Sequence, residues 1–204
     1  MIGNFEPQNM PMRRSFERVT RGPARCELGL TEDVYSGPTP SPVDVMPPPH
    51  VMRQRLGVVP QAQSNGSSCG QASVAMTLTY LTGKNWTDRD VNRHYGFGLA
   101  GALNAETRQL GLSWILKDFS AKSWPLIEEK LSLGRPVVMG LNGPKFSPSG
   151  RGHIVTLVAV ERDHIYFMDP ATGTRRCLLK SDFEQAAAYP GGNFYFCPRK
   201  TRRV

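Results

Sequence analysis

The sequence predicts a domain of the α+β class, in which helices come first along the chain and an antiparallel sheet follows. Residues 69–134 contain short apolar runs that follow N-cap residues and end at glycines, as helices do. Residues 135–197 contain apolar runs bounded by turn residues, which is typical of strands. The chain has 204 residues, 39% of them hydrophobic, so it is long enough for one domain with its own core.

The best-defined predicted helix covers residues 69–82. Ser67 and Ser68 supply N-cap chemistry at its start, and Gly83 ends it. Apolar side chains lie on most of its sides, so we expect this helix to be buried at the centre of the domain. Further helices are expected to begin at Thr87, at Asn104 and at Ser123, and a capping box over 181–184 opens the last one.

Residues 153–160 and 165–169 are predicted to pair as a hairpin. Both are apolar runs, HIVTLVAV and IYFMD, and the charged stretch ERDH between them supplies the turn. Other strands are expected over 135–142, 175–179 and 193–197, and a short extended lead-in over 56–60.

Residues 1–50 differ in composition from the rest of the chain. They contain nine of the seventeen prolines, many of them in the stretch SGPTPSPVDVMPPPH. Proline fixes φ and has no backbone N–H, so this segment favours neither a helix nor a central strand. We therefore expect a disordered leader over 1–50, a folded domain over 51–198 and a basic tail over 199–204.

The net charge of +8 is compatible with an acidic partner, but no nucleic-acid-binding module is recognisable. We interpret the charge as a solvated face and a basic tail, and expect no nucleic acid. No apolar run approaches the ~18 residues of a membrane span, and the N-terminus has no secretory signal pattern. We expect either a cytoplasmic protein or one delivered by a dedicated secretion system, with its oligomeric state left open.

The four cysteines are Cys26, Cys69, Cys177 and Cys197. No two of them have the spacing of metal ligands, so we expect neither a metal nor another cofactor. Cys177 and Cys197 could pair in an oxidising compartment, but without a signal peptide free thiols are the default.

Cys69 lies where the polar loop Asn65–Ser68 gives way to the predicted central helix. A helix N-terminus carries unpaired N–H groups and a partial positive charge, which favour thiolate over thiol. Cysteine is also among the most frequently buried residue types, and many buried cysteines are inert. The position of Cys69 alone leaves both interpretations open.

A cysteine nucleophile needs a base and a group that orients the base. His153 opens the first strand of the predicted hairpin and Asp169 closes the second, so both lie at its open end. Adjacent strands are ~4.8 Å apart, within reach of an imidazole–carboxylate hydrogen bond. Each residue also has a simpler explanation, as a strand-edge histidine and as a turn acid before proline. The remaining histidines, which are weaker candidates, are His50, His94 and His164.

Gln63 lies six residues before Cys69. Acyl transfer places negative charge on the carbonyl oxygen, which a side-chain amide and the backbone N–H of the nucleophile can stabilise together. A single glutamine in a loop is usually only solvated, so its spacing from Cys69 is the informative feature.

Together these residues resemble the papain-like cysteine peptidases. The resemblance rests on Gln63, on Cys69-Gly70 at the start of a long helix, on GHIVTLVAV and on Asp169-Pro170, and it covers roughly 56–197. The most similar branches are the leader peptidases of bacteriocin exporters, with their free-standing relatives, and the papain-like avirulence effectors. Glycine at position 70, where papain has tryptophan, favours the leader-peptidase branch, although no exporter segments follow the domain.

The resemblance implies a papain-like fold, with the Cys69 helix packed on an antiparallel sheet. It implies Cys69 as nucleophile, His153 as general base and acid, Asp169 as the orienting group and Gln63 as oxyanion donor. The expected function is hydrolysis of peptide bonds in a protein substrate, bound in a cleft of which residues 143–152 form one wall. The leader is compatible with an effector injected into a host cell.

Two other functions stay open. The same side chains could carry out another acyl transfer, such as deamidation or transglutamination, because the nucleophile and the base are alike. A non-catalytic peptide-binding relative is the second possibility; such relatives usually lack the cysteine or the histidine, and both are present here.

Overall fold

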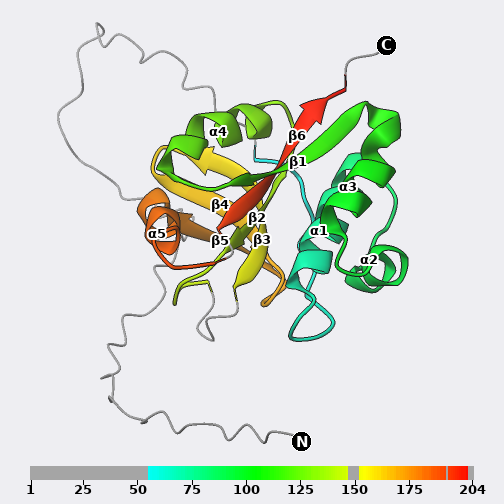
Figure 1. Cartoon of the computed structure of the whole chain (residues 1–204), viewed down its shortest axis with the longest axis horizontal. Coiled ribbons are helices and arrows are strands. Elements are labelled where there is room, and N and C mark those ends of the chain that lie inside the picture. The colour runs from blue at the N-terminus through cyan, green and yellow to red at the C-terminus, as the bar shows by residue number, and fades with distance from the viewer. Residues whose placement is uncertain (1–54, 147–151, 192, 202–204) are drawn as a thin grey trace, which may run out of the picture.

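The computed structural model describes residues 55–146, 152–191 and 193–201. The expected leader over 1–50 lies outside these residues. Within them the chain forms five α-helices and one six-stranded sheet, which confirms the α+β class (Figure 1). The helices are α1 (Cys69–Thr82), α2 (Asp88–Tyr95), α3 (Leu99–Thr107), α4 (Trp124–Ser132) and α5 (Lys180–Ala186). The strands are β1 (Leu112–Asp118), β2 (Val137–Leu141), β3 (His153–Glu161), β4 (His164–Asp169), β5 (Thr174–Leu179) and β6 (Phe194–Lys200).

All neighbouring strands are antiparallel, in the order β1-β6-β2-β3-β4-β5. The central strand β2 is buried on both faces, as an apolar run without alternation requires. Val138 packs with residues of α1 and α3, whereas Met139, one residue on, packs with residues of α4 and α5. Successive side chains of a strand point to opposite faces, so the sheet lies between two groups of helices.

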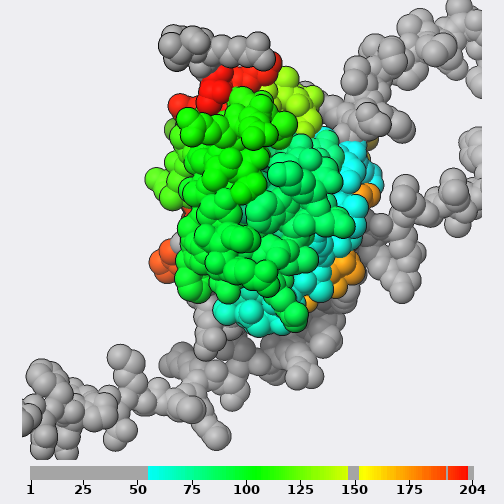
Figure 2. All heavy atoms as spheres, turned by 90° about the vertical axis from the view of Figure 1, so that its right-hand side faces the viewer, coloured from blue at the N-terminus to red at the C-terminus, as the bar shows by residue number. Residues whose placement is uncertain are grey.

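Helix α1 spans the predicted residues 69–82, and its residues 70–78 are buried. Gly83 ends it in the left-handed conformation, and its N–H donates to the carbonyl of Thr79. Seen from the helical side, α1, α2 and α3 form one continuous surface beside the segment that leads into α1 (Figure 2). Because its residues 70–78 are buried, α1 is central to the domain, as its apolar sides indicated.

Three elements before the last strand differ from the sequence prediction. Strand β1 was not predicted; it is an edge strand in which only Leu112 and Trp114 are buried. Asn104 does not cap a helix but lies inside α3, where its side chain exchanges two hydrogen bonds with the backbone of Trp114 in β1. Helix α5 begins at Lys180 rather than at Ser181, and the carboxylate of Asp182 accepts the N–H of Leu179.

The last strand, β6, continues to Lys200, three residues beyond the predicted end at 197. Its extension pairs Arg199 and Lys200 with Ser113 and Leu112 at the start of β1. The strand therefore extends into the expected basic tail. Its backbone pairing could not be predicted from a run of basic side chains.

An aromatic cluster joins α5 to the sheet. The ring of Phe183 makes edge contacts with those of Trp124, Phe146 and Phe167, at centroid distances of 5.8, 4.8 and 5.6 Å. Phe183 is fully buried.

Replacing Phe183 by alanine is expected to lower the free energy of unfolding by about 3–5 kcal/mol, because it leaves a cavity among three rings. Urea denaturation measures this. Phe97→Ala is the matched control, since Phe97 is 84% exposed and its loss should change the stability by less than about 0.5 kcal/mol. Equal effects of the two substitutions would contradict the packing described here.

Candidate active site

Cys69 is the first residue of α1 and is partly exposed, whereas the residues that follow it are buried. The packing around position 70 leaves little room for a side chain, which favours glycine there. A Cβ there would lie 2.7 Å from Leu99 and 3.1 Å from Ile154, so glycine lets α3 and β3 approach the start of the helix closely. A tryptophan, as papain has, would not fit between these neighbours.

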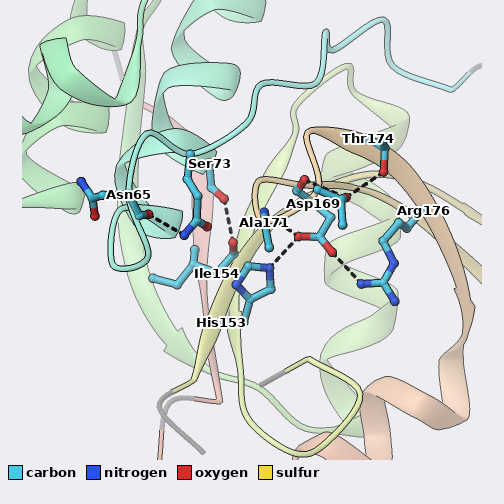
Figure 3. A network of polar contacts seen from close by, with 10 residues as sticks. Asn65, Ser73, His153, Ile154, Asp169, Ala171, Thr174 and Arg176 are labelled. Atoms are coloured by element: carbon cyan, nitrogen blue, oxygen red, sulfur yellow. Dashed lines mark hydrogen bonds and ion pairs between the residues drawn. The ribbon is translucent and has the colours of Figure 1, made fainter. Parts of the chain in front are cut away.

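Two hydrogen bonds fix α1 against β3 one turn after Cys69. The hydroxyl of Ser73 donates to the carbonyl of Ile154 at 2.9 Å (Figure 3), and the hydroxyl of Thr156 donates to the carbonyl of Ser73 at 3.0 Å. Ser73 and Thr156 are fully buried. Buried hydroxyls require partners, so this pair fixes the position of the helix along the strand and thereby brings Cys69 to the start of β3.

His153 and Asp169 lie at the same end of the β3–β4 hairpin. Nε2 of His153 is 2.7 Å from Oδ1 of Asp169 (Figure 3). The strands pair Thr156 with Met168, with an irregularity between Leu157 and Ala159. Extending this register sets Asp169 opposite Val155, so His153 is its diagonal neighbour on the same face, a separation that an imidazole spans.

Asp169 is 2% exposed and accepts three hydrogen bonds. Its partners are His153, the backbone N–H of Ala171 at 2.9 Å and the guanidinium of Arg176 at 2.5 Å. Burial would raise the pKa of Asp169, but the bonds from His153 and Arg176 lower it to about 2. Asp169 is thus a carboxylate at any physiological pH.

Sequence analysis did not identify Arg176. It lies on β5 directly opposite Phe167 of β4, two residues along the strand from Asp169, and its side chain is one-third exposed. Only the pairing of β4 with β5 brings it to the carboxylate. The sequence does show an arginine in the predicted strand that follows Asp169-Pro170. Composition alone, however, does not distinguish this residue from an ordinary surface arginine.

The side chains of Cys69 and His153 are hydrogen-bonded to each other. Because Nε2 of the ring contacts Asp169, Nδ1 is the atom that faces the sulfur. Burial would raise the pKa of Cys69, but the bond and charge of His153 and the backbone N–H groups of Ile154 and Gly70 lower it overall. Burial would also lower the pKa of His153, but its bonds to Asp169 and Cys69 raise it to about 9. At neutral pH these shifts favour a thiolate–imidazolium pair.

The backbone N–H of Gln63 donates to the carbonyl of Pro170, the residue after Asp169, at 2.8 Å. Its side-chain Nε2 donates to the carbonyl of Asn65 at 2.6 Å. Its Oε1 is buried and has no hydrogen-bond partner among the described residues. The loop before Cys69 and the turn after Asp169 are therefore joined directly.

Two of the other candidate histidines lie away from this site, and His50 lies outside the described residues. His164 is exposed at the turn of the hairpin, opposite Glu161 and at the far end from His153. His94 is exposed on α2, near the ring of Trp86. Half of the expected cleft wall over 143–152, residues 147–151, lies outside the described residues. In the described half, Phe146 packs into the aromatic cluster.

Neither Cys177 nor Cys197 is in a disulfide. Cys177 is in β5 and Cys197 in β6, with β4, β3 and β2 between them, so they cannot form a disulfide in this fold. Among residues 55–146, 152–191 and 193–201, no group of three or more potential ligands could hold a metal ion. No helix in the same part of the chain has the length and apolar character that a membrane crossing requires.

Residues 55–191 match the model of the Peptidase_C39 like family. The chain belongs to this family. The match covers most of the chain and includes Gln63, Cys69, His153 and Asp169. The family is one of cysteine peptidases, so the expected kind of peptidase is confirmed at the level of the family.

The fold is similar to that of a solved C39-like peptidase, and two further solved structures match less well. A C39-like peptidase from Bacillus anthracis is 16% identical, with a TM-score of 0.54 over 72% of this chain and 98% of that one. A double glycine motif protease from an AMS/PCAT transporter, solved with its leader peptide, is 22% identical, with a TM-score of 0.49 over 74% and 97%. The peptidase domain of Streptococcus ComA is 14% identical, with a TM-score of 0.48 over 70% and 99%. No curated protein sequence matches this chain.

Proposed function

We propose that this C39-like chain hydrolyses peptide bonds of a protein substrate through Cys69, His153 and Asp169. The observation that carries the proposal is the hydrogen-bonded series of these three side chains at one end of the β3–β4 hairpin. A buried structural cysteine has no need of an imidazole partner. Cys197 illustrates the difference, because burial raises the pKa of its thiol.

In the proposed reaction the Cys69 thiolate attacks the carbonyl carbon of the peptide bond. A C–S bond forms and the carbonyl π electrons move to the oxygen. His153 then gives its Nδ1 proton to the leaving amine as the C–N bond breaks. Water attacks the resulting thioester while neutral His153 accepts a proton from it, and release of the acid restores the thiolate–imidazolium pair.

Gln63 is the proposed oxyanion donor, together with the backbone N–H of Cys69. An amide nitrogen carries two hydrogens. One of those on Nε2 is donated to Asn65, and the proposal assigns the second to the substrate oxygen. Losing one such donor typically costs ~3 kcal/mol of transition-state stabilisation.

The proposal predicts an activity profile with two pH limits. Above about pH 9, the pKa of His153, the ring loses the proton that the leaving amine requires. At low pH the thiolate is protonated, and its lowered pKa moves this limit below that of an ordinary thiol.

Delivery into a host cell, expected from the composition of residues 1–50, remains a prediction.

The experiment compares a cell lysate treated with the full chain and with its Cys69→Ala variant. New peptide N-termini that require Cys69 are the expected result. Shifts of about one mass unit at glutamine or asparagine, without new termini, would instead indicate deamidation by the same thiolate. Neither change, despite a reactive Cys69, would contradict hydrolysis and favour a peptide-binding protein.

A further inference from the structure

A second buried carboxylate contacts the loop that precedes the nucleophile. Asp88 is the first residue of α2 and is 6% exposed. Its Oδ2 accepts the backbone N–H of Ser64 and the hydroxyl of Ser68, both at 2.6 Å. Burial would raise the pKa of Asp88, but the hydrogen bonds from Ser68 and Ser64 lower it overall, so the group is ionised at neutral pH.

These two serines lie near the two ends of residues 63–68, here termed the oxyanion loop. The loop connects the proposed oxyanion donor to the nucleophile, and residues 64–67 are exposed. At its start the N–H of Gln63 donates to the carbonyl of Pro170 at 2.8 Å. Contacts within the loop are those of Asn65, which accepts from Gln63 at 2.6 Å and, through Oδ1, from the N–H of Ser67 at 2.9 Å. An exposed loop that contains glycine has many conformations available unless outside contacts restrict it.

Asp88 supplies such a contact from a well-defined position. The preceding residue, Thr87, forms a capping box with Asp90, which fixes the first turn of α2. An acidic residue in the first turn of a helix is usually explained by its favourable interaction with the helix dipole alone. Asp88, however, is buried and bonds residues 20 and 24 positions earlier in the chain.

We propose that Asp88 is a positioning residue that holds the oxyanion loop, so that the Gln63 amide and the Cys69 N–H point to one place. It acts through Ser64 and Ser68 and does not touch the substrate. Stabilisation of an oxyanion requires donors within hydrogen-bond distance of its final position, so a loosened loop weakens it. The inference rests on the function proposed above.

Two reactions of Cys69 separate this role from a general effect on folding. Acylation by p-nitrophenyl acetate passes through a tetrahedral oxyanion, forms a thioester and releases p-nitrophenolate. Alkylation by iodoacetamide displaces iodide without any oxyanion. Both rates are measured on the full chain, and the rates of Cys69→Ala are subtracted to remove the other thiols. The ratio of acylation to alkylation then reports the oxyanion site.

Asp88→Ala is expected to lower this ratio about tenfold, with alkylation within about twofold of wild type. Asp88→Asn should retain most of the ratio, because its amide oxygen can accept both bonds. Asp90→Ala is the matched control: Asp90 lies in the same first turn of α2, but its carboxylate bonds Thr87 in the capping box rather than the loop, so the ratio should not change. Ser68→Ala, which removes one of the two bonds, should also lower it.

An unchanged ratio in Asp88→Ala would overturn the inference, as would an equal fall in Asp90→Ala, which would indicate helix stability alone. If Asp88→Ala does not fold by circular dichroism, Ser68→Ala decides the question by the same ratio. Wild-type Cys69 that alkylates no faster than Cys177 would instead refute the proposed function, so the two failures are distinguishable.

Discussion

Replacing His153 by alanine is expected to slow alkylation of Cys69 by iodoacetamide at about pH 6 by roughly 100-fold or more. An ordinary thiol of pKa about 8.5 is only about 0.3% thiolate at that pH. In the wild type the bond and charge of His153 lower the pKa of Cys69 and so favour its thiolate. Mass spectrometry of labelled peptides over time gives the rate at each cysteine.

His164→Ala is the matched control, since His164 lies at the other end of the same hairpin and is exposed. It should leave the labelling of Cys69 unchanged. Alkylation of Cys69 at the wild-type rate in His153→Ala would show that the imidazole does not activate the sulfur. Peptide hydrolysis should fall further than alkylation, because His153 is also the proposed general acid, a role worth typically about 10²–10⁴-fold.

Replacing Asp169 by alanine is expected to reduce both the reactivity of Cys69 and the stability of the domain. The substitution leaves the buried ring of His153 without its acceptor and removes the ion-pair partner of Arg176. Without the carboxylate the pKa of His153 should fall from about 9 and the thiolate lose part of its stabilisation. A carboxyl with a native pKa near 2 contributes about 2–3 kcal/mol to folding at neutral pH.

The sign of the pH dependence follows from the lowered pKa. The stabilisation by Asp169 is present above about pH 4, the ordinary value for aspartate, and is lost as the pH falls toward 2. Urea denaturation at neutral pH and at about pH 3 measures this stabilisation. The difference in free energy of unfolding between wild type and Asp169→Ala, here termed the gap, should narrow on acidification. A gap that is constant over this range would contradict an ionised, hydrogen-bonded carboxylate.

Arg176→Met provides the control for this substitution. If Arg176 acts mainly on Asp169, the double variant should be less destabilised than the sum of the single variants, because the second substitution removes a partner that is already unpaired. Additive effects would indicate that the two side chains are energetically independent.

The candidate site residues that lie at element boundaries could be located from the sequence. Cys69 follows the serines that marked the start of the helix, although Ser68 makes no side-chain capping bond, and His153 and Asp169 flank a hairpin whose turn is marked by charged residues. Local patterns were therefore sufficient to bring His153 and Asp169 to one end of the hairpin. Register was not predictable, because the irregularity after Leu157 shifts the pairing and only the packed structure shows it.

The residues that were missed depend on contacts between elements distant in the sequence. Arg176 reaches Asp169 through strand pairing, Asp88 reaches Ser68 through packing of α2 against the loop, and Ser73 meets β3 across the core. Strand β1 was missed because its sequence, LSWILKD, lacks a regular apolar–polar alternation. Asn104, which was interpreted as a helix cap, bonds the backbone of this strand. Tertiary context overrides local preference at such positions.

The state of the Cys69 thiol is the central claim, and titration of thiolate absorbance near 240 nm tests it most directly. The difference between the wild-type chain and Cys69→Ala isolates this sulfur from the other cysteines. An apparent pKa well below about 8.5, with thiolate already present at about pH 6, is the expected result. Titration at or above about 8.5 would contradict the ion pair with His153, and with it the proposed peptidase.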